Sequence, residues 1–177
     1  FYRKERINMK QQKTKRLVYL SLLTALAIVL HTIDHYLSAP LPLGVKLGLA
    51  NIISLVVVEL YGIKEMFTIN FFRVMISGLI TGSLMSYPFF MSCGGVLLSS
   101  LSLVVLKKLT ALPMVSTSII AAVFHNIGQI IVLSFFLSSK AFISYVFIML
   151  ISSIPTGIFT GMVAIEILKR VRKEQFQ

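Results

Sequence analysis

Arg73 is the residue with the largest free-energy cost of insertion into a membrane, because it interrupts an otherwise apolar stretch. Asn70 precedes it by three positions and Ser77 follows by four, so the three side chains share one face of a helix. An arginine at mid-membrane costs about 2.5–3.5 kcal/mol on insertion scales, so we expect this face to turn into a helix bundle. Two interpretations stay open. Arg73 either pairs with Glu59 or backbone carbonyls in a structural network, or provides a counter-charge for an anionic ligand.

A second polar group consists of His125, Asn126 and Gln129, again within an apolar stretch. His125 and Gln129 lie one turn apart and form a polar strip along a predicted helix. No acidic residue accompanies them, so we expect hydrogen bonding, either to a ligand or within the core, and no metal site.

The stretch 41–51 is rich in proline and glycine at its start and runs directly into an apolar segment. Proline interrupts a helix there, and Lys46 and Asn51 lie near the start of the next predicted helix. We interpret this stretch as the lip of a binding site at one membrane face. Asp34 and His35 precede it and either cap a ligand from outside or form a solvated helix end.

The composition is that of an integral membrane protein. The chain has 177 residues, of which 56% are hydrophobic and only 13% charged, and its mean hydropathy is +0.89. The net charge of +11 arises largely at the two ends, where basic residues flank apolar segments as topology determinants do. We therefore expect no nucleic-acid partner. Cys93 is the single cysteine, which excludes a disulfide within the chain.

The apolar segments predict an all-α bundle of six transmembrane helices joined by short loops. A basic cytoplasmic arm at 1–16 precedes this domain at 17–168, and a basic cytoplasmic tail at 169–177 follows it. With both termini inside, 14 of the 17 basic residues lie on the cytoplasmic side, which predicts a multi-pass protein of the cell membrane. The first segment lacks a small-residue cleavage site and is expected to be retained. The predicted spans are Leu17–Ile33, Val45–Leu60, Met66–Leu84, Phe89–Leu106, Met114–Leu137 and Phe142–Leu168.

Pairs of small residues recur at a spacing of four, which lets helices approach closely in lipid. Each pair serves either packing inside the bundle or docking of another membrane subunit. The pairs are Ser21 and Ala25, Gly78 and Gly82, and Gly157 and Gly161.

The aromatic run at 87–90 is expected to mark the loop between the third and fourth spans, at the membrane interface. Gly94 and Gly95 follow, and glycines there would allow a backbone to approach a ligand closely.

Motifs for catalysis are missing from the sequence. It contains no glycine-rich phosphate loop with its lysine, no aspartate-rich pair for prenyl transfer and no zinc-protease motif. We therefore expect a protein that is not an enzyme, holds no cofactor and does not hydrolyse ATP alone.

The order of these motifs resembles the family of heptaprenyl diphosphate synthase component I, also called the Gx transporter family. The resemblance is carried by 44–51 (Gly-Val-Lys-Leu-Gly-Leu-Ala-Asn), by Phe72-Arg73-Val74 leading to Gly78, by Gly94-Gly95 and by 125–129 (His-Asn-Ile-Gly-Gln). That family is in turn similar to the substrate-binding (S) components of energy-coupling factor (ECF) transporters.

The resemblance implies a six-helix protein that captures a vitamin or its precursor from outside. It also implies a transmembrane coupling subunit and two cytoplasmic ATPases as partners, with ATP used by the ATPases. The loop 31–43 would cap the ligand, and Ser21 and Ala25 would dock the coupling subunit, in place of the family's cleaner pattern of two alanines.

Two functions follow as hypotheses. The first is an S component that binds a small, anionic, amphiphilic molecule such as a flavin, a quinone precursor or an isoprenoid diphosphate. Lys46, Asn51, Asn70, Arg73, His125, Asn126 and Gln129, with Asp34 and His35, are its candidate ligand-binding residues. The alternative is a non-catalytic membrane accessory subunit of an electron-transfer or prenyl diphosphate synthase complex.

Overall fold

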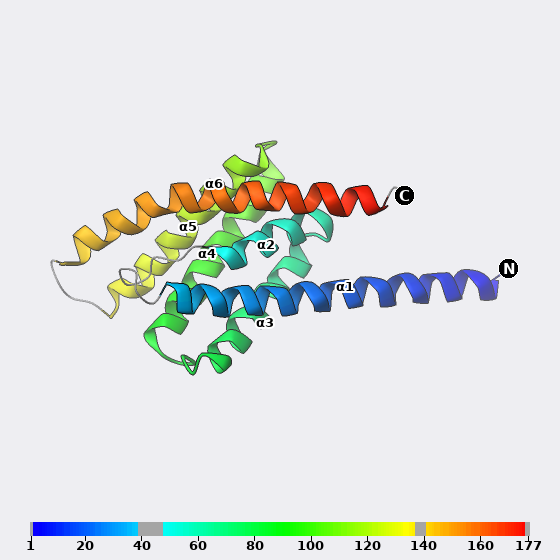
Figure 1. Cartoon of the computed structure of the whole chain (residues 1–177), viewed down its shortest axis with the longest axis horizontal. Coiled ribbons are helices and arrows are strands. Elements are labelled where there is room, and N and C mark those ends of the chain that lie inside the picture. The colour runs from blue at the N-terminus through cyan, green and yellow to red at the C-terminus, as the bar shows by residue number, and fades with distance from the viewer. Residues whose placement is uncertain (1, 39–47, 137–140, 176–177) are drawn as a thin grey trace.

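A computed structural model describes residues 2–38, 48–136 and 141–175, and within these ranges it contains six α-helices and no strand (Figure 1). The predicted all-α class with six helices is thereby confirmed. The helices are α1 (Tyr2–Leu37), α2 (Leu49–Leu60), α3 (Ile63–Ile80), α4 (Tyr87–Leu109), α5 (Met114–Ser134) and α6 (Ala141–Gln175).

Four stretches of helix are long and apolar enough to cross a membrane, namely Gln11–Leu37, Tyr87–Leu109, Met114–Ser134 and Val146–Val171. The other two helices differ for physical reasons. With 12 residues, α2 is shorter than the roughly 20 residues that span a bilayer. With 18 residues, α3 carries three charged side chains, Lys64, Glu65 and Arg73.

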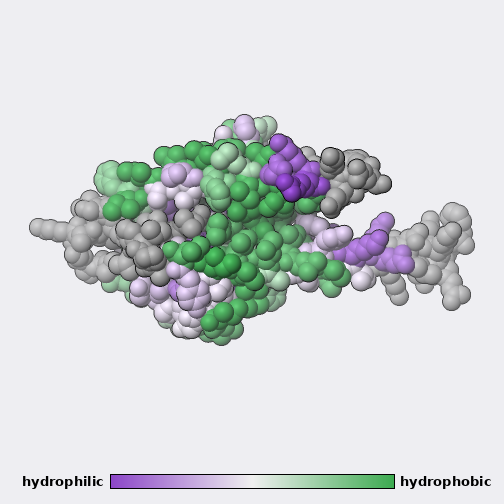
Figure 2. Space-filling view, viewed as in Figure 1, coloured by the Kyte–Doolittle hydropathy of each residue, from purple (hydrophilic) through white to green (hydrophobic). Residues whose placement is uncertain are grey.

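The short helix α2 is the centre of the bundle. It packs against α1, α3, α4 and α6, and its residues 52–58 are all buried. Its apolar side chains form one core with Ala27 of α1, Met66 of α3 and Ala164 of α6. The outer surface is also strongly apolar over much of the face shown in Figure 2, as expected where lipid is the solvent.

One end of the bundle, which we call the basic end, carries both chain termini (Figure 1). There Arg16 of α1 pairs with Glu65 of α3, and the Lys107 ammonium donates to the Val58 carbonyl at the end of α2. Figure 2 shows strongly hydrophilic patches near this end. α1 continues as one helix across the predicted boundary between 16 and 17, so the basic arm extends the first span. α2 begins inside the bundle, on the side of it that faces away from the basic end, and we call the region around its first residues the Gly48 end (Figure 1).

Glycines bring α5 into close contact with both of its neighbours. A Cβ on Gly128 would lie 2.3 Å from the Gly94 carbonyl oxygen, and one on Gly157 would lie 2.6 Å from the Ile119 Cα. Gly161 contacts α5 in the same way as Gly157, so this pair packs inside the bundle. The close approach expected at Gly94 and Gly95 is therefore made by the backbone and side chains of α5.

Two sequence predictions at the turn between α3 and α4 were wrong. Residues 87–90 do not form a loop: α4 begins at Tyr87, and Pro88 lies in its first turn, where a missing N–H costs nothing. Gly82 does not pair with Gly78 on a helix either, because α3 ends at Ile80 and Gly82 adopts a left-handed φ of 65° in the turn.

Candidate functional site

A buried carboxylate joins the end of α1 to the start of α2. Asp34 is only 4% exposed, and its Oδ2 accepts a hydrogen bond of 3.1 Å from the Gly48 N–H. Gly48 precedes the first residue of α2 and has a left-handed φ of 73°, a conformation that favours glycine. Asp34 thus holds in place the point where α2 begins.

Beside Gly48 lies a cavity where α2, α5 and α6 meet. Its volume of about 10 Å³ is close to the space of one water molecule. The polar groups that face it are uncharged amides and hydroxyls together with an imidazole. The lining residues are Gly48, Asn51, Ala122, His125, Asn126, Thr156 and Thr160.

The polar strip of α5 lies inside the bundle, with His125 and Asn126 each 8% exposed and Gln129 fully buried. Asn126 donates a hydrogen bond to the Met149 carbonyl of α6. His125 and Gln129 both pack onto Gly95 of α4. Neither amide atom of Gln129 has a hydrogen-bond partner within the described ranges, which is costly for a buried amide.

Arg73 is 1% exposed and belongs to a network that links α2, α3 and α4. Its Nη1 donates to the Ala50 carbonyl and lies 3.5 Å from the Ser54 Oγ. The Ser54 hydroxyl donates to the Asn70 Oδ1 at 2.7 Å, and the Asn70 Nδ2 donates to the Ser100 Oγ at 2.9 Å. The face shared by Asn70, Arg73 and Ser77 is buried, as the sequence pattern predicts.

The charge of Arg73 is opposed within the protein. The carboxylate that acts on it electrostatically is Asp34, which is buried at the Gly48 end. Glu59, one of the two partners anticipated for Arg73, instead pairs with Lys107 at 3.4 Å at the basic end. The other anticipated partner, a backbone carbonyl, is the one observed.

Four of the predicted site residues lie together at the Gly48 end, namely Asp34, Asn51, His125 and Asn126. Three others are buried where helices pack against each other, namely Asn70, Arg73 and Gln129. His35 is half-buried, and its ring makes an edge contact with Tyr36 at 5.5 Å between centroids. Lys46 lies outside the described residues.

Sequence reasoning missed Thr156 and Thr160, which line the cavity from α6. They lie one turn apart and follow Pro155, so their spacing was a readable signal. Both hydroxyls also donate to carbonyls of their own helix, and Thr160 contacts the Ser118 hydroxyl at 2.8 Å.

The predicted docking residues Ser21 and Ala25 are exposed on α1 and line a groove between α1 and α3. This pair therefore differs from Gly157 and Gly161, because none of the six described helices covers it.

Helices of this length and apolarity, with a polar interior, define a helical membrane protein. The family model described as heptaprenyl diphosphate synthase component I matches residues 23–167, and the chain belongs to this family. Neither a curated protein nor a solved structure matches the chain.

Proposed function

We propose that this protein is the substrate-binding component of an ECF-type transporter and captures a small amphiphilic molecule at the Gly48 end. The observation that carries the proposal is the convergence of Asp34, Asn51, His125 and Asn126 around the start of α2. Polar side chains inside a membrane protein are costly and commonly mark a substrate pathway.

The orientation that we propose follows from charge. Basic residues such as Lys107, Lys108 and Arg170 flank the basic end, so this end faces the cytoplasm and the Gly48 end faces outside. All six helices then cross or enter the membrane, with α2 shielded from lipid by its neighbours. The chain is thus a multi-pass protein of the cell membrane.

The chemistry of the lining supports a ligand with several hydrogen-bonding groups and an apolar body. Amide, imidazole and hydroxyl groups can donate to or accept from a ring carbonyl, a ring nitrogen or a hydroxyl. An anionic group on the ligand would compete with Asp34 for Arg73. Flavins, quinone precursors and isoprenoid diphosphates are the candidate classes.

Capture requires a change of shape, because ligand sites have volumes of roughly 300–1,000 Å³ and the present cavity has about 10 Å³. The structure therefore represents a form of the protein in which this cavity is closed. A ligand drives reorganisation only if its contacts differ between states. We assign those differing contacts to Asn51 of α2 and to Thr156 of α6, which both line the cavity.

Energy for transport would come from other chains, since the sequence has no phosphate-binding loop. The partners are a transmembrane coupling subunit and two cytoplasmic ATPases. The exposed face with Ser21 and Ala25 is the surface we assign to the coupling subunit.

The test is gentle purification from the native membrane, followed by native mass spectrometry. The proposal expects a reproducible small-molecule adduct and co-purifying ATPases. Asn51→Leu removes a cavity-lining amide and should lower adduct occupancy at least tenfold. The matched control is Ser152→Ala on α6, because the Ser152 hydroxyl donates to the Met149 carbonyl of its own helix and does not line the cavity. Equal occupancy in both variants would refute the assigned site.

The family description favours a second candidate function, a non-catalytic membrane subunit of a prenyl diphosphate synthase. An accessory role in an electron-transfer complex belongs to the same class. The synthase role predicts co-purification with a soluble prenyl synthase and a change in its product length when this chain is removed. Absence of a small-molecule adduct together with such a partner would favour this candidate.

A further inference from the structure

A groove of about 570 Å³ runs between α1 and α3, starting at the basic end. Its floor includes buried Ile69, and its wall includes Phe72, which is 47% exposed. The groove is lined by Leu17, Leu20, Ser21, Thr24, Ala25 and Ile28 of α1 and by Lys64, Glu65, Thr68, Ile69, Phe72 and Ile76 of α3.

The body of the groove suits a hydrocarbon chain. The small side chains of Ser21 and Ala25 leave it hollow. The hydroxyls of Thr24 and Thr68 donate to carbonyls of their own helices, at 2.7 Å and 3.0 Å, so their single donor hydrogens are already used. The remaining walls are aliphatic or aromatic.

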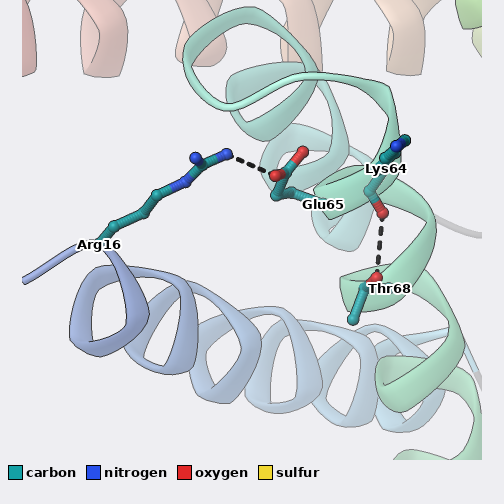
Figure 3. A network of polar contacts seen from close by, with 4 residues as sticks. All are labelled: Arg16, Lys64, Glu65 and Thr68. Carbon is teal, nitrogen blue, oxygen red and sulfur yellow. Dashed lines mark hydrogen bonds and ion pairs between the residues drawn. The ribbon is translucent and has the colours of Figure 1, made fainter. Parts of the chain in front are cut away.

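The mouth of the groove is polar and carries a net positive charge. The guanidinium of Arg16 pairs with the carboxylate of Glu65, as Figure 3 shows. Lys64 precedes Glu65 on α3, and its side chain points away from the Arg16–Glu65 pair (Figure 3). Its ammonium makes no ion pair with a described carboxylate. Arg16, Glu65 and Lys64 together carry one net positive charge, which resides on the ammonium of Lys64.

The length of the groove is close to the thickness of one leaflet. Leu17 and Ile28 are 11 positions apart on α1, which corresponds to about 17 Å at 1.5 Å per residue. One leaflet is half of the roughly 30 Å hydrocarbon core, or about 15 Å. The length of the groove thus matches one acyl chain of one leaflet.

We propose that the α1–α3 groove binds one anionic phospholipid of the leaflet at the basic end. Its phosphate is held by Lys64, and one acyl chain lies along Ser21 and Ala25. This lipid site is separate from the cavity at Gly48, and the inference does not depend on the proposed transport function. The lipid also fills the face of α1 while no partner subunit covers it.

The experiment is native mass spectrometry of the purified full chain, exchanged into micelles that contain equal amounts of phosphatidylglycerol and phosphatidylcholine with identical acyl chains. We expect one phosphatidylglycerol to be retained per protein, in preference to phosphatidylcholine. Equal retention of the two lipids would overturn the assignment of an anionic headgroup.

Two variants locate the site. Lys64→Gln should weaken phosphatidylglycerol retention about fivefold, the effect of one basic residue near a membrane surface, whereas Lys108→Gln, at the same end on α4, should not. Ala25→Leu should fill the groove and abolish selective retention, whereas Val29→Leu, exposed elsewhere on α1, should not. Unchanged retention in both Lys64→Gln and Ala25→Leu would overturn the proposal, as would retention that falls equally in the controls.

Discussion

Gly128→Ala should separate α4 from α5 and disturb the polar strip on α5. The added Cβ would lie 2.3 Å from the Gly94 carbonyl oxygen and 3.0 Å from the Gly95 Cα, whereas ordinary contact begins at 3.4 Å. Both neighbours are backbone atoms of a regular helix and cannot turn aside. The two helices must therefore move apart by about 1 Å.

The magnitude follows from two opposing effects. Alanine in place of glycine favours a helix interior by up to about 1 kcal/mol. Overpacking typically costs about 1–3 kcal/mol, and a clash between two backbones belongs at the upper end. The net loss is about 2 kcal/mol, which lowers the melting temperature by roughly 4–8 °C in a chain of this length.

The assay is thermal unfolding in mild detergent, followed by circular dichroism, with Gly78→Ala as the matched control. A Cβ on Gly78 would meet the ring of Phe89 at 2.9 Å, and a ring edge can shift where a backbone cannot. The control should melt within about 2 °C of the parent protein. A Gly128→Ala protein that melts at or above the parent temperature would refute the α4–α5 contact.

Three further substitutions probe the interior polar groups. Gln129→Leu should raise the free energy of unfolding by about 1–3 kcal/mol, because a buried amide with neither atom bonded is removed; a destabilised variant would contradict this. Arg73→Met should lower the free energy of unfolding by about 1–3 kcal/mol in urea titration, since the buried Ala50 carbonyl loses its donor; an unchanged free energy of unfolding would contradict this. Thr160→Val should lower the free energy of unfolding by about 1 kcal/mol, because the hydrogen bond with Ser118 is lost. An unchanged midpoint of urea unfolding would contradict a stabilising role for that hydrogen bond.

Features of the fold that depend on the cost of polar groups in lipid were predictable from the sequence. The shared face of Asn70, Arg73 and Ser77 had to turn inward, and all three are buried. The predicted start of α5 at Met114 was also correct, because Pro113 lies just before it. Such features need only local spacing and hydropathy.

Features that depend on the backbone of a distant helix were not predictable in the same way. Arg73 donates to the Ala50 carbonyl, and every residue has such a carbonyl, so the sequence does not indicate which one accepts the bond. The packing of α2 against α3 determines that the partner is Ala50 and not Glu59. Likewise, Gly94 and Gly95 indicated a close approach, but only the structure identifies α5 as the partner.

The candidate site was predictable in part. Asn51, His125 and Asn126 come from segments far apart in the sequence, and the structure gathers them around one cavity. Thr156 and Thr160 escaped notice because threonine hydroxyls on an apolar helix usually bond their own backbone, as these also do. Their second role depends on the position of α6 beside α2.

The central claim is that the Gly48 end captures a small molecule. Native mass spectrometry of the protein, purified gently from its own membrane, tests this most directly. We predict a reproducible small-molecule adduct that Asn51→Leu removes and Ser152→Ala retains. A protein that carries no adduct but keeps a stable protein partner would contradict the claim and favour the accessory role.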